Sequence, residues 1–327
     1  MKLLAPVNSL KTTIKQIKAG ADEIYLGGDT QIFNSLSFSG RGRYNLENEK
    51  ICPDFMELRE IVQYAHSKDV TVMFTANIPF LAEDPCGSQK YLGHFYDYVE
   101  NAMMAQVDSI VVGDLGAILF LKEKGVNVHL TSSSFLETLN RDQILFLKEL
   151  GVNRVVLSYQ ILLHEIEELT SYNDLEIEIF GHFGCSFYDG YCNMKHINGE
   201  TAEHPTGIPC QNFYHMNSNG KKSMKGQYLN CSLTCSLCSL PQISKSSVYA
   251  LKLVGRELDM EQNYLITDIY HKALQKIEEL TINGQFDMDT YKAFINNLLP
   301  EWWKHTLCRK GLCKYLRNRI TESFTGL

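Results

Sequence analysis

The sequence lacks any apolar run of the roughly 18–20 residues that a membrane-spanning helix requires. The apolar stretch near its start, within MKLLAPVNSLKTTIKQIKAG, is too short for a signal peptide. The sequence therefore shows no feature that directs a chain into or across a membrane. We expect a cytoplasmic protein that does not enter the membrane.

Familiar catalytic and nucleotide-binding motifs are also missing. Gly27-Gly28 follows a predicted strand but does not open a G-x-G-x-x-G turn, which argues against a dinucleotide-binding fold. The sequence has no H-E-x-x-H zinc helix and no G-x-S-x-G elbow, the signatures of common metallopeptidases and serine hydrolases. Ser132–Ser134 follow His129 closely, but polar residues at the end of a strand explain this segment better than a nucleophile and its base.

An excess of positive charge is missing as well. The formal net charge is −7, so the surface has no general attraction for nucleic acid or for an anionic membrane. The C-terminal region is the exception, because its basic residues keep RNA open as a substrate. These residues are Lys304, Arg309, Lys310, Lys314, Arg317 and Arg319.

What the sequence does contain is a repeated alternation of short apolar runs and amphipathic stretches. Hydrophobic residues make up 44% of the 327 positions, enough to bury a core of barrel size. Runs rich in Val, Ile and Leu are typical of parallel strands, and helix-length segments such as Phe55–Lys68, Gly93–Gln106 and Arg141–Leu150 lie between them. This rhythm predicts an α/β fold, a (β/α)8 TIM-like barrel. The expected strands are Lys2–Pro6, Glu23–Leu26, Val70–Ala76, Ser109–Val112, Val128–Leu130, Arg154–Leu157, Leu175–Phe180 and Tyr249–Val254.

We expect the barrel to occupy residues 1–256 and a helical C-terminal appendix to occupy 257–327. A cysteine-rich insertion at 181–247 separates the seventh strand from the eighth. Catalytic residues of such barrels lie at the carboxyl ends of the strands, so the insertion should stand at the catalytic mouth. The strand ends are Gly27, Asn77, Asp114, Thr131–Ser134, Ser158-Tyr159 and His182, with Asn77 and Asp114 as weaker site candidates.

The ten cysteines are unevenly distributed. In a reducing cytosol clustered cysteines more often bind metal or take part in catalysis than form disulfides. Cys52 and Cys86 are isolated, and we expect them to be buried as small apolar side chains. Cys308 and Cys313 form a last pair, in a segment that we expect to be an amphipathic helix with Trp302 and Trp303 packed on the barrel; contact with a partner or a cluster is the alternative.

The six central cysteines indicate a metal centre. Iron–sulfur clusters usually have four thiolate ligands, and zinc can also take four. Zinc sites usually show two close cysteine pairs, whereas only Cys235 and Cys238 form one here, so the wide spacing favours a cluster. Aromatic neighbours would exclude water from such a centre. The six are Cys185, Cys192, Cys210, Cys231, Cys235 and Cys238.

Residues 231–238 also match the C-x-x-x-C-x-x-C signature of radical S-adenosylmethionine enzymes. In those enzymes the motif follows the first strand of the barrel, whereas here it follows the seventh. Leu237 also stands where the usual residue is aromatic. A radical S-adenosylmethionine enzyme is therefore kept only as an alternative.

Several motifs occur together in one order: LLAPV and AGADEIYLGG near the start, then GHFGC, DGYC, Cys210, and LKLVGR at 251–256. In this combination the chain resembles peptidase family U32 over about residues 1–260. The resemblance implies a barrel with a 4Fe-4S cluster and, for several members, oxygen-independent hydroxylation of tRNA, ribosomal RNA or a quinone precursor. It also implies the ligands Cys185, Cys192, Cys210 and Cys235, with Cys231 or Cys238 as alternates to the last.

Three further residues are candidates for the site. His182 ends a strand three residues before Cys185 and would serve as a proton donor or as a partner to a cluster sulfur, although a structural histidine is nearly as good an explanation. Lys252 and Arg256 end the eighth strand and would bind an anionic group such as a carboxylate. An ion pair inside the barrel explains both cations equally well.

The sequence thus predicts an iron–sulfur enzyme of the U32 type, an oxygen-independent hydroxylase or a related redox enzyme. Its substrate would be RNA, a quinone precursor or an anionic small molecule, with a homologous protein as a further candidate partner. Val254 stands where the family has an acidic residue, and Ser158-Tyr159 where it has Arg-Glu, so the substrate is expected to differ. A peptidase and a non-catalytic cluster-binding subunit of a hetero-oligomer are the alternatives.

Overall fold

The structure is a computed structural model of the chain. It describes residues 1–29, 52–77, 90–171, 175–182, 214–215, 217–222, 225, 234–255, 258–284, 286–309 and 311–315. Within these ranges no helix is both long enough and apolar enough to cross a bilayer.

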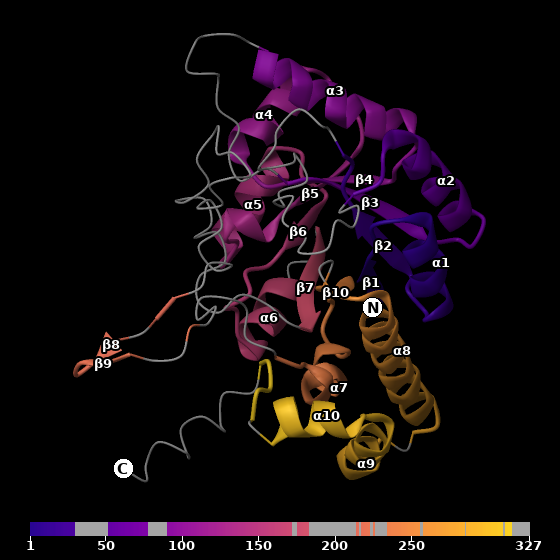
Figure 1. Cartoon of the computed structure of the whole chain (residues 1–327), viewed down its shortest axis with the longest axis vertical. Helices are drawn as coiled ribbons and strands as arrows, with labels where there is room; N and C mark the ends of the chain where they lie inside the picture. Colours follow the sequence, from indigo (N-terminus) through magenta and orange to yellow (C-terminus); the bar gives the residue numbers. More distant parts are fainter. Residues whose placement is uncertain are drawn as a thin grey trace.

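Eight parallel strands form a closed barrel in the order β1-β10-β7-β6-β5-β4-β3-β2 (Figure 1). The first and last strands close it, with Leu3 of β1 opposite Leu251 of β10. The predicted (β/α)8 barrel is therefore confirmed, and each strand lies close to the expected range. The strands are β1 (Lys2–Pro6), β2 (Glu23–Leu26), β3 (Thr71–Ala76), β4 (Ser109–Val112), β5 (His129–Ser132), β6 (Arg154–Val156), β7 (Glu176–His182) and β10 (Ala250–Leu253).

Helices surround the barrel, and polar side chains mark where several of them begin. Asp54, for example, accepts hydrogen bonds from the N–H groups of Met56 and Glu57 at the start of α2. Such a cap satisfies N–H groups that the helix itself leaves without partners. The helices are α1 (Leu10–Lys18), α2 (Phe55–His66), α3 (Lys90–Met104), α4 (Leu115–Glu123), α5 (Arg141–Glu149), α6 (Leu163–Thr170), α7 (Leu240–Ile243), α8 (Met260–Ile282), α9 (Met288–Leu298) and α10 (Glu301–Trp303).

Successive side chains of each strand point alternately to the helices and to the barrel axis. The outward set packs with the helices in one large core. The inward set includes a smaller apolar cluster of Leu4, Tyr25, Met73 and Val111. Two kinds of core therefore hold the strands, one on each face of the sheet.

Charged side chains fill the amino end of the barrel. The guanidinium group of Arg154, the first residue of β6, contacts three carboxylates. Its Nη1 lies 2.6 Å from Glu23 Oε2 and 3.4 Å from Glu178 Oε2, and its Nε lies 2.7 Å from Glu176 Oε2. Lys2 lies 3.4 Å from Glu23. Because these residues belong to β1, β2, β6 and β7, the ion pairs join strands from opposite sides of the barrel.

The described helices of the appendix, α8 to α10, follow the last barrel strand and share the outer core of the barrel. Tyr270 of α8, Tyr291 of α9 and Trp303 of α10 are fully buried and belong to the same core as the barrel strands. Figure 1 shows α9 and α10 beside α7, on the opposite side of the molecule from α3 and α4. The appendix is thus packed on the end of the chain's own barrel.

The described part of the insertion holds a short hairpin and the approach to α7. Strands β8 (Asn217–Ser218) and β9 (Lys221–Lys222) pair in antiparallel fashion. Asn219 and Gly220 connect them with positive φ values of 52° and 76°. Asn-Gly is the preferred pair for this type of two-residue turn, so the hairpin follows from local sequence.

Candidate functional site

Three distant parts of the chain meet at the carboxyl end of β7. His182, the last residue of β7, forms an antiparallel bridge with Cys235, and Cys235 forms a parallel bridge with Cys313. The N–H of Cys235 donates to the carbonyl of Leu312 at 3.1 Å, and the N–H of Lys314 donates to the carbonyl of Cys235 at 2.8 Å. Backbone pairing thus joins the insertion to the end of β7, and joins the appendix to the insertion.

Aromatic side chains enclose this junction. The imidazole of His182 is fully buried, with its ring centroid 4.6 Å from that of Trp303 and 5.9 Å from that of Tyr270. Burial lowers the pKa of His182 to about 3, so the ring is neutral near pH 7. The Tyr270 hydroxyl donates to the carbonyl of Gly181 at 2.6 Å. His182 therefore lies where it can hold neighbouring groups in position, away from solvent.

Four cysteines line one cavity beside this junction. Cys235 and Cys238 come from the insertion, and Cys308 and Cys313 come from the appendix. The cavity has a volume of about 140 Å³, and Tyr291 is among the residues that close it. Within the described residues no three His, Cys, Asp or Glu side chains are arranged to hold a metal ion. The four thiols share a cavity but do not converge on one point in it.

The surroundings of Cys235 govern the ionisation of its thiol. Burial raises its pKa to about 12, although N–H groups of Leu237 and Trp303 favour the thiolate. The indole N–H of Trp303 is buried and makes no hydrogen bond of normal distance and angle among the described residues. An N–H group directed at a sulfur is a common support for a metal-bound thiolate.

Of the predicted cluster ligands, only Cys235 and the alternate Cys238 fall within the described residues. The remaining ligands of that set therefore stay a prediction, as does the role of the arginine in LKLVGR. The residues outside the described part are Cys185, Cys192, Cys210, Cys231 and Arg256.

Lys252 is described, and it lies inside the barrel. Its Nζ is 3.0 Å from Glu178 Oε1 and 4.7 Å from the centroid of the Tyr25 ring. This is the internal ion pair that the sequence analysis offered as the alternative to an anion-binding role.

The appendix also covers the mouth between β6 and β7. Lys314 is buried, lies 3.1 Å from the centroid of the Tyr159 ring, and donates to the Tyr159 carbonyl at 2.9 Å. The hydroxyl of Tyr315 donates to the carbonyl of Phe180 at 2.7 Å. Tyr159 is one of the two positions where the chain departs from the family pattern, so the appendix places a cation at the altered position.

Other strand-end candidates have different roles. Asp114 caps α4, because its carboxylate accepts the N–H of Ala117 at 2.8 Å. The Oδ1 atom of Asn77, at the end of β3, is buried without a hydrogen-bond partner among the described residues. His129 begins β5 and Ser132 ends it, so the two lie at opposite ends of the strand. They do not form a nucleophile and base.

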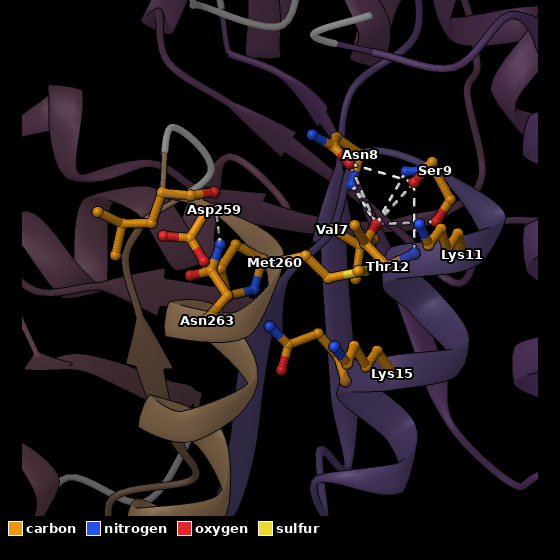
Figure 2. Close-up of a pocket in the computed structure, with 12 residues that line it drawn as sticks. Val7, Asn8, Ser9, Lys11, Thr12, Lys15, Asp259, Met260 and Asn263 are labelled. Atoms are coloured by element: carbon orange, nitrogen blue, oxygen red, sulfur yellow. Dashed lines mark hydrogen bonds between the residues drawn. The ribbon is translucent and has the colours of Figure 1, made fainter. Parts of the chain in front are cut away.

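A second cavity lies at the rim of the mouth between α1 and α8 (Figure 2). Its volume is about 310 Å³. Asn8, Ser9 and Thr12 face Asp259 and Asn263 across it. Both groups of residues follow strands that close the barrel, β1 and β10, so this cavity belongs to the carboxyl end as well.

The chain matches a known protein family over most of its length. The family model for peptidase family U32 matches residues 8–305. The chain belongs to peptidase family U32. The match continues well past residue 260, where the resemblance in the sequence analysis ended, and so takes in most of the appendix of this U32 chain.

Curated relatives of this U32 chain include proteins with different activities in their names. A collagenase of Porphyromonas gingivalis is 23% identical, covering 88% of this chain and 67% of the relative. The tRNA hydroxylation protein P1 of Bacillus subtilis is 25% identical, covering 84% and 63%. The 23S rRNA 5-hydroxycytidine synthase of Escherichia coli is 24% identical, covering 85% and 40%. This U32 chain thus spans about two fifths to two thirds of the length of these relatives.

Contact with a cluster was only the alternative expected for Cys308 and Cys313, yet both lie with Cys235 and Cys238 at one cavity of this U32 chain. The expected packing of the appendix is found for Trp303, which is buried, whereas Trp302 is 46% exposed. The signal that could have found the group is the spacing of Cys308 and Cys313. A C-x-x-x-x-C pair is within the spacing of metal-binding cysteine pairs.

Proposed function

We propose that this U32 chain is an oxygen-independent hydroxylase that carries a 4Fe-4S cluster and modifies a base in RNA. The observation that carries the proposal is the carboxyl end of β7, where His182 is buried among the aromatic rings of Tyr270 and Trp303. The segment with Cys185, Cys192 and Cys210 follows His182 directly in the sequence. Catalytic groups of such barrels belong at this end of the strands.

The cluster would be held by Cys185, Cys192, Cys210 and one thiolate of the 231–238 group, with Cys235 favoured because the resemblance to the family implies it. The surroundings of Cys235 suit this chemistry, because buried aromatic rings keep water away and the Trp303 N–H faces the sulfur. A bound 4Fe-4S cluster would supply one-electron transfer.

The residues of the chain itself would bind and orient the substrate. The buried amide oxygen of Asn77 lacks a partner among the described residues and would meet a base only if the side chain turned toward the mouth. An amide in such a position can accept a hydrogen bond from the N–H edge of a base. The neutral imidazole of His182 would help to hold the β7 end and Trp303 in position.

RNA is the substrate class that the relatives favour, since two of them are named for hydroxylation of tRNA or of 23S rRNA. The net charge of −7 gives no general attraction for RNA, so recognition would depend on local contacts. A homologous protein is kept as a further candidate partner.

Anaerobic purification tests the cluster. We expect iron and acid-labile sulfide in the wild-type protein, with an absorption and EPR signature that Cys185→Ala abolishes. Cys52→Ala is the matched control, because Cys52 is buried but lies outside the cysteine-rich segment. Wild-type protein free of both iron and sulfide would contradict the proposal.

The substrate is tested separately. Mass spectrometry of RNA nucleosides from cells that lack the gene should show the loss of a hydroxylated nucleoside, restored by the wild-type chain and not by Cys185→Ala. An unchanged nucleoside profile would remove RNA from the proposal and leave the cluster untouched.

A peptidase is the second candidate, favoured by the relative that is named a collagenase. Cleavage of collagen or casein by the purified chain, at the same rate in Cys185→Ala, would favour it over the redox enzyme. A partner subunit that co-purifies with the chain and is required for activity would instead favour the non-catalytic subunit.

A further inference from the structure

The cavity lined by four cysteines is the feature that the proposed cluster does not explain. Its two cysteine pairs, Cys235/Cys238 and Cys308/Cys313, lie some seventy residues apart in sequence. Their spacings, C-x-x-C and C-x-x-x-x-C, are both those of metal-binding pairs. Among the six central cysteines only Cys235 and Cys238 form a close pair, which disfavoured zinc. In the structure Cys308 and Cys313 supply a second pair at the same cavity.

Backbone hydrogen bonds hold the two pairs against each other. The segment before Lys314 runs beside Cys235, with Cys235 bonded to Leu312 on one side and to Lys314 on the other. The hydroxyl of Ser239 donates to the carbonyl of Lys314 at 3.0 Å. The main chain therefore brings the two pairs to one cavity, where the thiols do not converge on one point, and binding one metal would require them to turn about χ1.

The cavity walls suit a thiolate-bound metal better than water. Leu237, Ile295, Leu299 and Leu307 are buried and apolar. The Trp303 indole N–H is fully buried, faces Cys235 and lacks a full hydrogen bond among the described residues. A buried donor of this kind is expected beside a negatively charged sulfur. A volume of about 140 Å³ exceeds what a single water needs, which leaves room for a metal centre.

We propose that Cys235, Cys238, Cys308 and Cys313 hold a second metal centre, a zinc ion or an iron–sulfur cluster bound by four thiolates. Each cysteine loses its proton to solvent as its sulfur binds the metal. Lys292 lies at the cavity and is exposed, so its ammonium group can offset part of the resulting negative charge. The centre clamps the appendix to the carboxyl end of the barrel.

This assignment divides the clustered cysteines of the chain into two sets of four. The second centre uses Cys235 and Cys238, so Cys231 becomes the thiolate of the 231–238 group that is left for the cluster with Cys185, Cys192 and Cys210. The resemblance to the family implies Cys235 as the fourth ligand of that cluster. The present assignment gives this place to Cys231 and moves Cys235 to the second centre. The inference does not depend on the proposed hydroxylation, because the clamp would form in a protein of any activity.

The clamp also has a structural consequence at the mouth. The same segment that carries Cys313 places Lys314 on the Tyr159 ring and Tyr315 on the Phe180 carbonyl. Fixing Cys313 to the metal would fix these contacts. The second centre therefore shapes the mouth through the position of the appendix and is not itself proposed to react.

Metal analysis of four full-length proteins, purified anaerobically, tests the proposal. These are the wild type, Cys308→Ser/Cys313→Ser, Cys185→Ser/Cys192→Ser, and Cys52→Ser as a control. We expect the Cys308/Cys313 variant to lose one zinc per chain, or the iron and sulfide of one cluster, and to keep the metal that the Cys185/Cys192 variant loses. Loss of zinc identifies a zinc site, with sulfur at about 2.3 Å by X-ray absorption; loss of iron with sulfide identifies a cluster.

Retention of the full wild-type metal content by Cys308→Ser/Cys313→Ser would overturn the proposal, and so would a disulfide between these two cysteines in the wild type. A wild type that binds metal only through the Cys185 set overturns it while leaving the proposed function intact. Conversely, a wild type whose only metal depends on Cys308 and Cys313 supports the clamp and removes the proposed cluster.

Chelation of the wild-type protein separates metal loss from misfolding of a variant. Removal of the metal should speed hydrogen exchange at the N–H groups of Cys235 and Lys314, which hold the appendix in place, and leave exchange in β3 and β4 unchanged. Unchanged exchange at Cys235 and Lys314 after the metal has been removed would refute the clamp. Comparison of Cys231→Ser with Cys235→Ser tests which centre each cysteine binds. Cys235→Ser should lose the same metal as Cys308→Ser/Cys313→Ser, and Cys231→Ser the same metal as Cys185→Ser/Cys192→Ser. Loss of the latter metal in Cys235→Ser would refute the proposed second centre.

Discussion

The two ends of the barrel are filled in opposite ways by the same strands. At the amino end and just inside it, three carboxylates, Glu23, Glu176 and Glu178, face three cations, Arg154, Lys2 and Lys252. At the carboxyl end the buried groups are thiols, aromatic rings and a neutral histidine. Carboxylates and cations balance one another at the amino end, whereas at the carboxyl end the buried thiols are uncharged and the buried cation Lys314 lies on the Tyr159 ring.

This difference separates stability from function along one axis. Buried carboxylates without cations would carry a large desolvation cost, so the amino end is complete as it stands. Buried thiols carry no charge until a metal binds, so the carboxyl end is complete without a ligand and is also ready for one. Replacing the charged groups of the amino end should therefore change stability, whereas replacing the thiols of the carboxyl end should change the bound metal.

The largest expected effect is at the amino end. Arg154→Met removes the cation that contacts Glu23, Glu176 and Glu178, and leaves buried carboxylates without it. We expect a loss of about 3–5 kcal/mol in the free energy of unfolding, measured with urea. Lys272→Met, which breaks an exposed pair with Asp268 on α8, should change it by only about 0.5 kcal/mol. Equal effects of the two variants would show that the barrel end is not held by its ion pairs.

The next largest effect on stability is expected from adding a methyl group at Gly181, at the carboxyl end of the barrel. A Cβ atom at Gly181 would lie 2.8 Å from the side chain of Leu251, which is fully buried. Gly181→Ala should therefore cost about 1–3 kcal/mol by overpacking and should disturb the bridge between His182 and Cys235. Gly93→Ala in α3 is the control: no atom lies within 4 Å of its Cβ position, so it should raise stability by about 1 kcal/mol. Gly181→Ala protein with wild-type stability and metal content would mean that the end of β7 adjusts freely.

Much of this barrel is readable from the sequence, because parallel strands buried on both faces appear as continuous apolar runs. Ser109–Val112 and Glu23–Leu26 were predicted with their final bounds for this reason. The placement of the insertion at the carboxyl end of the seventh strand also follows from the order of strands and insertion. Neither feature requires a particular contact between distant residues to be known.

The grouping of Cys308 and Cys313 with Cys235 was not readable. It depends on the path of α8, α9 and α10, which return the chain to the barrel over a long separation. Nor does the sequence reveal that Lys252 pairs with Glu178, because strand register and inward direction must both be known before that contact is visible. Contacts made between elements, rather than within them, are what the sequence left open.

The contribution of Glu176 to the stability of the amino end can be tested by lowering the pH. Burial tends to raise its pKa, but hydrogen bonds and charge from His129 and Arg154 outweigh this and lower it to about 2. A carboxyl whose pKa is lower in the folded state contributes stability above its unfolded value, near 4.5, and loses that contribution as the pH falls toward 2. After allowance for partial exposure, we expect about 2 kcal/mol to be lost over this interval.

Urea unfolding between pH 6 and pH 3 measures this loss. Glu176→Gln should be less stable than the wild type at pH 6 and should lose less as the pH falls. Parallel curves for the two proteins would show that the stability of the amino end at low pH does not depend on this carboxyl.

The smallest expected effect concerns Asp114, a strand-end residue that the sequence offered as a site candidate. In the structure its carboxylate accepts the N–H of Ala117 and so caps α4. Asp114→Ala should cost about 1 kcal/mol in stability, and Asp114→Asn, which keeps an oxygen acceptor, should cost less. Because a cap does not contact the metal centres, both variants should retain wild-type iron, sulfide and zinc. Loss of metal in Asp114→Asn at wild-type stability would contradict this, and would give the Asp114 carboxylate a role at the metal centres beyond capping α4.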